Sequence, residues 1–148
     1  MKKIVQLLFC VAMVILTGCE GSTPSYDDRR GFTIDAPHDV VKKYISAVQR
    51  ADFNELRTLT KGDALQEVGN TELMLSQLNS NEVNAAKIAV KYEAQNLSVT
   101  NKSTIKGNSA SVWAMDQSQK KPTYILFTLA RNDSSSPWYI YSIKSIKL

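Results

Sequence analysis

The sequence predicts an α+β domain in which N-terminal helices pack on one face of a curved antiparallel sheet of about four to five strands. Apolar residues recur at helical spacing between residues 37 and 78, and β-branched and aromatic residues alternate with polar ones from about residue 88 onward. The polar turns between the expected strands are too short for crossover helices, so neighbouring strands should form antiparallel hairpins. Helices followed by a run of strands are typical of the α+β class.

Three helical segments are expected. The first begins at Pro37, and its apolar stripe consists of Val40, Val41, Tyr44, Ile45 and Val48. Asp52 followed by Glu55 predicts a capped start for the second helix, which should end near Lys61-Gly62. The third helix is expected over residues 71–78, and its apolar set consists of Leu73, Met74, Leu75 and Leu78.

Period-two alternation predicts strands in the second half of the chain. They are expected near residues 88–92, 96–105, 109–116, 123–131 and 138–147. Turns are expected at Lys106-Gly107-Asn108 and at residues 117–121 and 132–137. The connections then form a meander.

Aromatic residues on these strands form a candidate binding face, which consists of Trp113, Trp138, Tyr139 and Tyr141. Because strand side chains alternate, Trp138 and Ile140 should lie on one face, and Tyr139, Tyr141 and Ile143 on the other. Core packing explains most of these aromatics. The second apolar face then needs cover from a small apolar ligand, a second copy in a homodimer or a protein partner.

Residues 1–18 have the pattern of an export signal. Lys2 and Lys3 precede an apolar segment over residues 4–16, which is too short to span about 30 Å of hydrocarbon. The segment ends in Leu-Thr-Gly-Cys, which resembles the lipobox of bacterial lipoproteins. This resemblance implies cleavage between Gly18 and Cys19, a diacylglycerol on the Cys19 sulfur and acylation of the new amino group, a palmitate-type anchor. An ordinary secretory signal with an accidental cysteine is one alternative. A buried N-terminal helix of a cytosolic protein is a weaker one, because the segment follows two lysines and has no polar face.

The signal also sets the expected location and domain organisation. Residues 19–35 are rich in small and polar residues and are expected to form a lipidated, flexible tether before a single domain at 36–148. Glu20 follows the cysteine, where an aspartate would favour inner-membrane retention in enteric bacteria. We therefore expect an outer-membrane anchor facing the periplasm, and keep the inner membrane and the cell surface as alternatives.

Composition limits the chemistry of the mature domain. Both cysteines, Cys10 and Cys19, fall within the signal region, so no free thiol is expected for a metal, a disulfide or a nucleophile. Lys2 and Lys3 account for half of the formal net charge of +4, which argues against nucleic-acid binding. The single histidine, His38, is expected in the first helical turn rather than as a general base. We expect no catalytic residue, metal or cofactor.

Residues 36–148 resemble the cystatin-like, nuclear-transport-factor-like cone, in particular small bacterial lipoproteins of unknown function built on it. The resemblance depends on the Asp-Val-Val-Lys-Lys-Tyr helix, on Arg50-Ala51-Asp52-Phe53 at the next helix, and on the strands that contain Trp113 and Trp138. It implies a sheet wrapped around helices, with room for a pocket in some relatives. The favoured function is a non-catalytic ligand- or protein-binding module. A pocket enzyme of the isomerase or hydrolase kind, and an inhibitor or immunity-type lipoprotein, are the alternatives.

Overall fold

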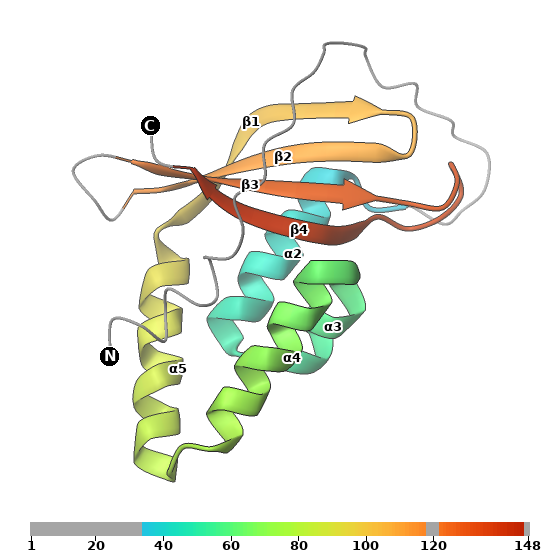
Figure 1. The fold of residues 1–148 in the computed structure, drawn as a ribbon. Helices are drawn as coiled ribbons and strands as arrows, with labels where there is room; N and C mark the ends of the chain where they lie inside the picture. Colours follow the sequence, from blue (N-terminus) through green and yellow to red (C-terminus); the bar gives the residue numbers. More distant parts are fainter. Residues whose placement is uncertain (1–33, 118–121, 147–148) are drawn as a thin grey trace.

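The computed structural model describes residues 34–117 and 122–146, where four helices precede four strands (Figure 1). The helices are α2 (Pro37–Arg50), α3 (Phe53–Leu59), α4 (Gly62–Ser76) and α5 (Ser80–Gln95). The strands are β1 (Leu97–Lys106), β2 (Ser109–Asp116), β3 (Thr123–Ala130) and β4 (Tyr139–Ile146). The expected strands from residue 96 onward are confirmed, with ends that differ by at most one residue.

The four strands form one antiparallel sheet in the order β1-β2-β3-β4, so the predicted meander and the α+β class are confirmed. The β1–β2 hairpin closes at Gly107, whose φ of 56° lies in the left-handed region. Glycine adopts this conformation without the clash that a Cβ would cause.

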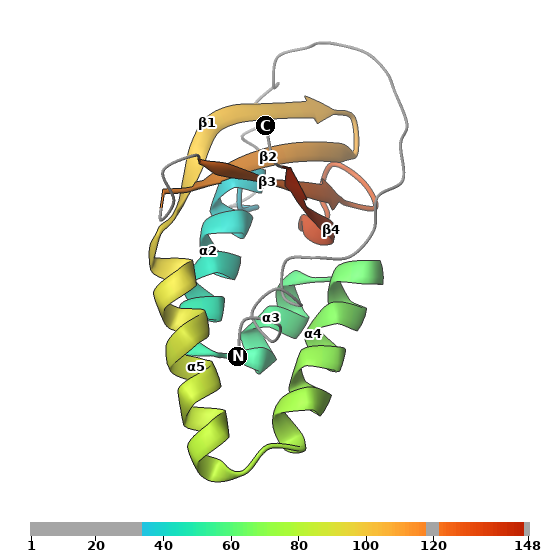
Figure 2. The same ribbon diagram turned by 60° about the vertical axis from the view of Figure 1, so that its left-hand side comes forward.

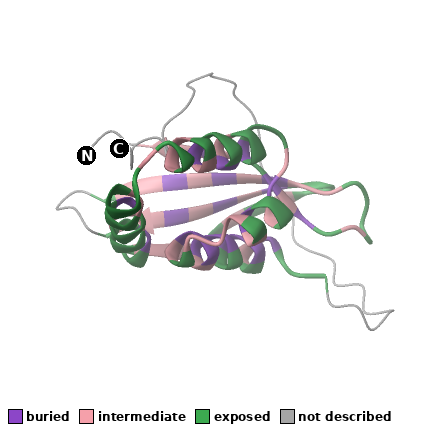
Figure 3. Ribbon diagram, turned by 90° about the horizontal axis from the view of Figure 1, so that it is seen from below, coloured by how far each residue is buried: buried purple, intermediate pink, exposed green. Residues whose placement is uncertain are grey.

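All four helices lie on one side of the sheet (Figures 1 and 2). Seen from that side, the buried residues of the strands lie behind the helices (Figure 3). The side chains that fill this interface are fully buried, and they include Val41 of α2, Val112 of β2, Phe127 and Leu129 of β3 and Ile140 of β4. The Tyr44 ring meets the Phe127 ring edge-on, with centroids 5.8 Å apart. We call this the inner face of the sheet.

The strand predicted at residues 88–92 is wrong, because these residues lie inside α5. The helix buries only small side chains, Ala86 and Ala94, whereas Ile88 and Tyr92 are 56% and 67% exposed. The large apolar residues of α5 therefore do not lie on its buried side. Their alternation with polar residues over 88–92 has the period of a strand, although the segment is helical. Asn79 and Glu82 form a complete capping box at the start of α5, which was the usable signal for a helix.

The third helix was predicted too short and with the wrong buried residues. α4 begins at Gly62 rather than near residue 71, and it buries Ala64, Val68 and Thr71. Leu73, which was expected to face inward, is 60% exposed. Small buried side chains give a weak hydrophobic periodicity. The apolar cluster near the C-terminal end of α4 therefore dominated the sequence pattern.

The predicted alternation along the last strand fails at a β-bulge. Ile140 pairs with Leu129 and Ser142 pairs with Thr128, which leaves Tyr141 as an extra residue in β4. The bulge shifts the alternation by one position. Ile143 therefore lies with Ile140 on the inner face, and both are buried. The prediction that Ile143 shares a face with Tyr141 is wrong.

Candidate functional site

The opposite face of the sheet carries none of the described helices (Figures 1 and 2). The strand pairing places Met115, Tyr124 and Ile146 in one row across this face, and Trp113, Leu126 and Lys144 in the next. The apolar members of both rows are partly exposed. We call this surface the outer face; it consists of these six residues together with Lys102 and Lys106.

Aromatic and cationic groups meet near the centre of the outer face. The Trp113 and Tyr124 rings pack edge-on with centroids 6.5 Å apart, and Lys102 Nζ lies 4.8 Å from the centroid of the Trp113 ring. A cation over an indole face is attracted by the negative charge of the ring face. The register of β1 shifts between Val99 and Ser103, and Thr100 Oγ1 donates to the Trp113 carbonyl at 3.0 Å. This irregular segment places Lys102 over the ring.

The charged residues of the outer face are all positive: the strand pairing places Lys106 and Lys144 there, and the contact with the Trp113 ring places Lys102 there. Asp116 is the only carboxylate on the described strands, and it lies on the inner side because it stands two residues from the buried Ala114. Burial, and then the nearby Asp116 carboxylate, raise the pKa of Glu93 at the end of α5. The carboxylates of Glu93 and Asp116 thus lie on the helix side of the sheet.

Of the four residues predicted as a binding face, Trp113 lies on the outer face, and the pairing of Tyr139 with Ala130 places Tyr139 on the same side of the sheet. Trp138 is 5% exposed, and the Arg131 guanidinium lies 4.5 Å from the centroid of its ring. Tyr124 and Leu126 were not predicted for this face. Their alternation with the buried Ile125 and Phe127 was a readable signal, since it makes β3 apolar on both sides.

The two tyrosines of β4 belong to a contact between the helices and the strand. The amide of Lys61 donates to the Ile140 carbonyl at 2.9 Å, and its ammonium lies 3.8 Å from the centroid of the Tyr139 ring. Gly62, with φ of 55°, lies against Tyr141: a Cβ there would be 3.0 Å from the ring. The loop between α3 and α4 therefore covers part of the β4 edge, and the four predicted aromatics do not share one face.

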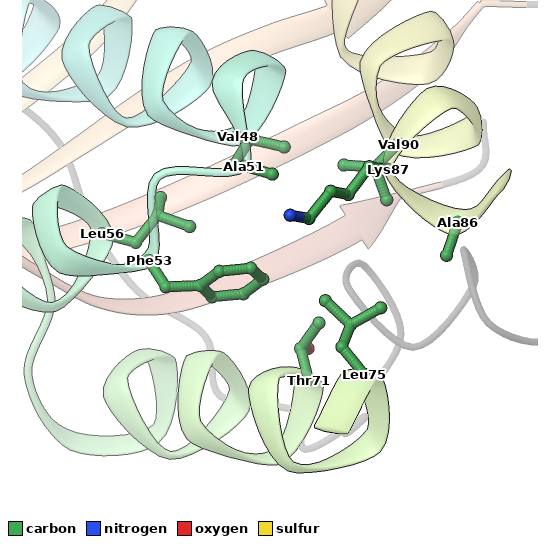
Figure 4. Close-up of a pocket in the computed structure, with 9 residues that line it drawn as sticks. All are labelled: Val48, Ala51, Phe53, Leu56, Thr71, Leu75, Ala86, Lys87 and Val90. Atoms are coloured by element: carbon green, nitrogen blue, oxygen red, sulfur yellow. The ribbon is translucent and has the colours of Figure 1, made fainter. Parts of the chain in front are cut away.

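A second concave region lies among the helices. α4 and α5 meet at the turn over residues 77–79 and separate towards the sheet (Figures 1 and 2). The space between them is about 400 Å³, including the part open to solvent. It is lined by Val48, Ala51, Phe53, Leu56, Thr71, Leu75, Ala86, Lys87 and Val90 (Figure 4). Lys87 is the only charged residue in this lining, and Thr71 Oγ1 donates to the Glu67 carbonyl at 2.9 Å.

Three groups capable of acid–base chemistry are buried or partly buried: His38, Tyr44 and Glu67. His38 Nε2 lies 3.2 Å from the Thr100 carbonyl, which can only accept, so this nitrogen donates. Burial, and then the Glu67 charge, raise the pKa of Tyr44, which is 3% exposed. Burial, and then Asp63, raise the pKa of Glu67. These groups are held against the core rather than presented together in a cleft.

Among residues 34–117 and 122–146, no group of three or more histidine, cysteine or carboxylate side chains could hold a metal ion. None of the helices in this part of the chain is long and apolar enough to cross a membrane. Gly18 and Cys19, the predicted cleavage and lipidation residues, lie outside the described residues. No protein-family model, curated protein or solved structure matches the chain.

Proposed function

We propose that this chain is a lipid-anchored protein of the bacterial cell envelope and that its domain is a non-catalytic binding module. The observation that carries the binding function is the outer face. There Trp113, Tyr124 and Leu126 remain partly exposed on the side of the sheet that carries no described helix. Partly exposed aromatics gathered on one surface are typical of interaction sites.

The contacts of the titratable groups support binding over catalysis. A general acid or base must reach the substrate, whereas Tyr44 is buried against Phe127 and His38 donates to a backbone carbonyl. The interface between α2 and the sheet is filled by side chains such as Val41 and Val112. The order of helices followed by a meander also supports the proposed likeness to the cystatin-like cone.

The lipid anchor is proposed from the Leu-Thr-Gly-Cys segment that ends at Cys19. The thiolate of this cysteine is the group that can form a thioether with the diacylglycerol. Glu20 supports the outer membrane as the destination in a Gram-negative host. The chain offers a matched pair of cysteines for the test, because Cys10 lies inside the apolar segment.

Cys19→Ser should abolish incorporation of a labelled fatty acid and remove the mature protein from the membrane fraction of a bacterial host. Cys10→Ser should leave both labelling and fractionation as in the wild type, because it preserves the lipobox. Unchanged labelling of Cys19→Ser would refute the anchor.

A further inference from the structure

The aromatic and lysine side chains of the outer face are of the kinds that are stable in the headgroup region of a lipid bilayer. Indole and phenol rings favour the membrane–water interface, where an apolar body and a polar tip are both satisfied. Lysine ammonium groups near a membrane surface are attracted to anionic headgroups. Trp113 and Tyr124 are in ring contact on this face, Lys102 lies over the Trp113 ring, and Lys106 and Lys144 lie on the same face.

We propose that the outer face docks flat on a bilayer that contains anionic lipid, with its aromatic rings at headgroup level and its lysines against lipid phosphates. This inference rests on the proposed function, because an anchor at Cys19 would hold the domain beside a membrane. The docked domain would present its helices, including the exposed Ile88 and Tyr92 of α5, away from the lipid.

Charge complementarity favours an anionic lipid surface over a second copy of the chain as the partner of the outer face. The outer face has three lysines, and Asp116, the only carboxylate of the described strands, lies on the other side of the sheet. A second copy in a twofold dimer would present the same lysines to each other, and like charges that oppose each other disfavour that pairing. An anionic lipid surface satisfies the lysines and the aromatic rings together.

The length of the chain before the domain is compatible with docking. About 17 residues separate Cys19 from Pro37, and fully extended they reach at most about 60 Å. Tethering makes docking intramolecular, so weak individual contacts suffice for a large docked fraction. Each lysine near an anionic surface contributes about fivefold to the docking equilibrium.

Fluorescence of the two tryptophans provides the test. The lipidated protein is purified from membranes and reconstituted into vesicles of phosphatidylcholine, with or without phosphatidylglycerol, in which some lipids carry brominated acyl chains that quench indole. Quenching should be strong in the anionic vesicles and weak in the neutral ones. It should be lost in Trp113→Phe, because Trp138 is buried beneath Arg131.

Two pairs of lysine substitutions test the orientation. Lys102→Gln with Lys144→Gln should lower the docking equilibrium in anionic vesicles about 25-fold, from two lysines at about fivefold each. Lys42→Gln with Lys91→Gln, at exposed positions of α2 and α5, makes the same change in net charge and should leave quenching as in the wild type. Circular dichroism establishes that each variant is folded.

The outcomes separate docking from anchoring. Protein that floats with anionic vesicles but shows no quenching of Trp113 overturns the docking and leaves the anchor intact. Equal losses in the two lysine pairs also overturn it, as does chemical cross-linking of two copies through the outer face. Protein that does not float refutes the anchor, and quenching with an excess of anionic vesicles then decides the docking separately.

Discussion

The two faces of the sheet differ in what covers them, although they alternate residue by residue along the same strands. On β3, Ile125, Phe127 and Leu129 are buried under the helices, whereas Tyr124 and Leu126 are partly exposed on the outer face. Apolar character alone therefore does not distinguish core from surface in this chain. The inner face holds the fold together, and the outer face is expected to bind.

Alanine substitutions at the neighbouring residues Phe127 and Leu126 should differ most in their cost to stability. Phe127→Ala should lower the free energy of unfolding by about 3–5 kcal/mol, because it removes a fully buried ring that contacts Tyr44. Leu126→Ala on the outer face should cost about 1 kcal/mol or less, since that side chain is partly in water already. Urea denaturation followed by circular dichroism measures both. Similar losses for the two variants would mean that the outer face is also covered.

Two glycines, Gly62 and Gly107, have nearly the same backbone conformation, but only Gly62 is packed against another residue. Gly62→Ala and Gly107→Ala should each cost about 1–2 kcal/mol, because alanine is strained at a φ of 55° or 56°. Gly62→Ala should cost more, since its Cβ would meet the Tyr141 ring at 3.0 Å, whereas Gly107 has nothing within 4 Å.

Thermal unfolding of the two glycine variants gives the difference directly. A further substitution, Tyr141→Ala combined with Gly62→Ala, should remove the excess cost and leave the backbone strain. If the two single variants unfold at the same temperature, the contact between the α3–α4 loop and β4 contributes nothing measurable.

The strands and α2 could be predicted from the sequence because their periodicities agree with their burial. The stripe of Val41, Tyr44 and Val48 faces the core, and polar turns bound the strands. α5 could not be predicted in this way, because Ile88 and Tyr92 lie on its exposed side. The α5 helix is stabilised by packing against α2 and by a capping box. A search for hydrophobic periodicity detects neither of these.

The outer face was predicted only in part, for a reason specific to β4. Trp113 was named for the binding face and lies on the outer face, but the position of Tyr141 depends on how β4 pairs with Thr128 and Leu129 of β3. A bulge is a property of two strands together, so one strand's sequence does not reveal it. The face on which Tyr124 and Leu126 lie could have been predicted from the sequence, since no bulge interrupts the alternation around them.

The smallest expected effect concerns charge near the inner face. Burial, and then Asp63, raise the pKa of Glu67, whose charge also raises the pKa of the buried Tyr44. An acid with a raised pKa binds its proton more tightly when folded, so its contribution to stability is full below the unfolded pKa of about 4.5 and is lost as pH rises through the folded pKa. Glu67→Gln should therefore stabilise the protein by a few tenths of a kcal/mol at pH 7, because water screens this partly exposed carboxylate.

That gain should disappear below about pH 4, where Glu67 is protonated in both states. Asp63→Asn should reduce the gain at pH 7, since Asp63 is one of the two causes of the raised pKa. Urea denaturation at pH 4 and pH 7 measures these differences. A Glu67→Gln variant that is less stable than the wild type at pH 7 would show that the carboxylate makes a favourable contact there. The inner face would then tolerate charge as the outer face does, and coverage by helices would no longer explain the difference between them.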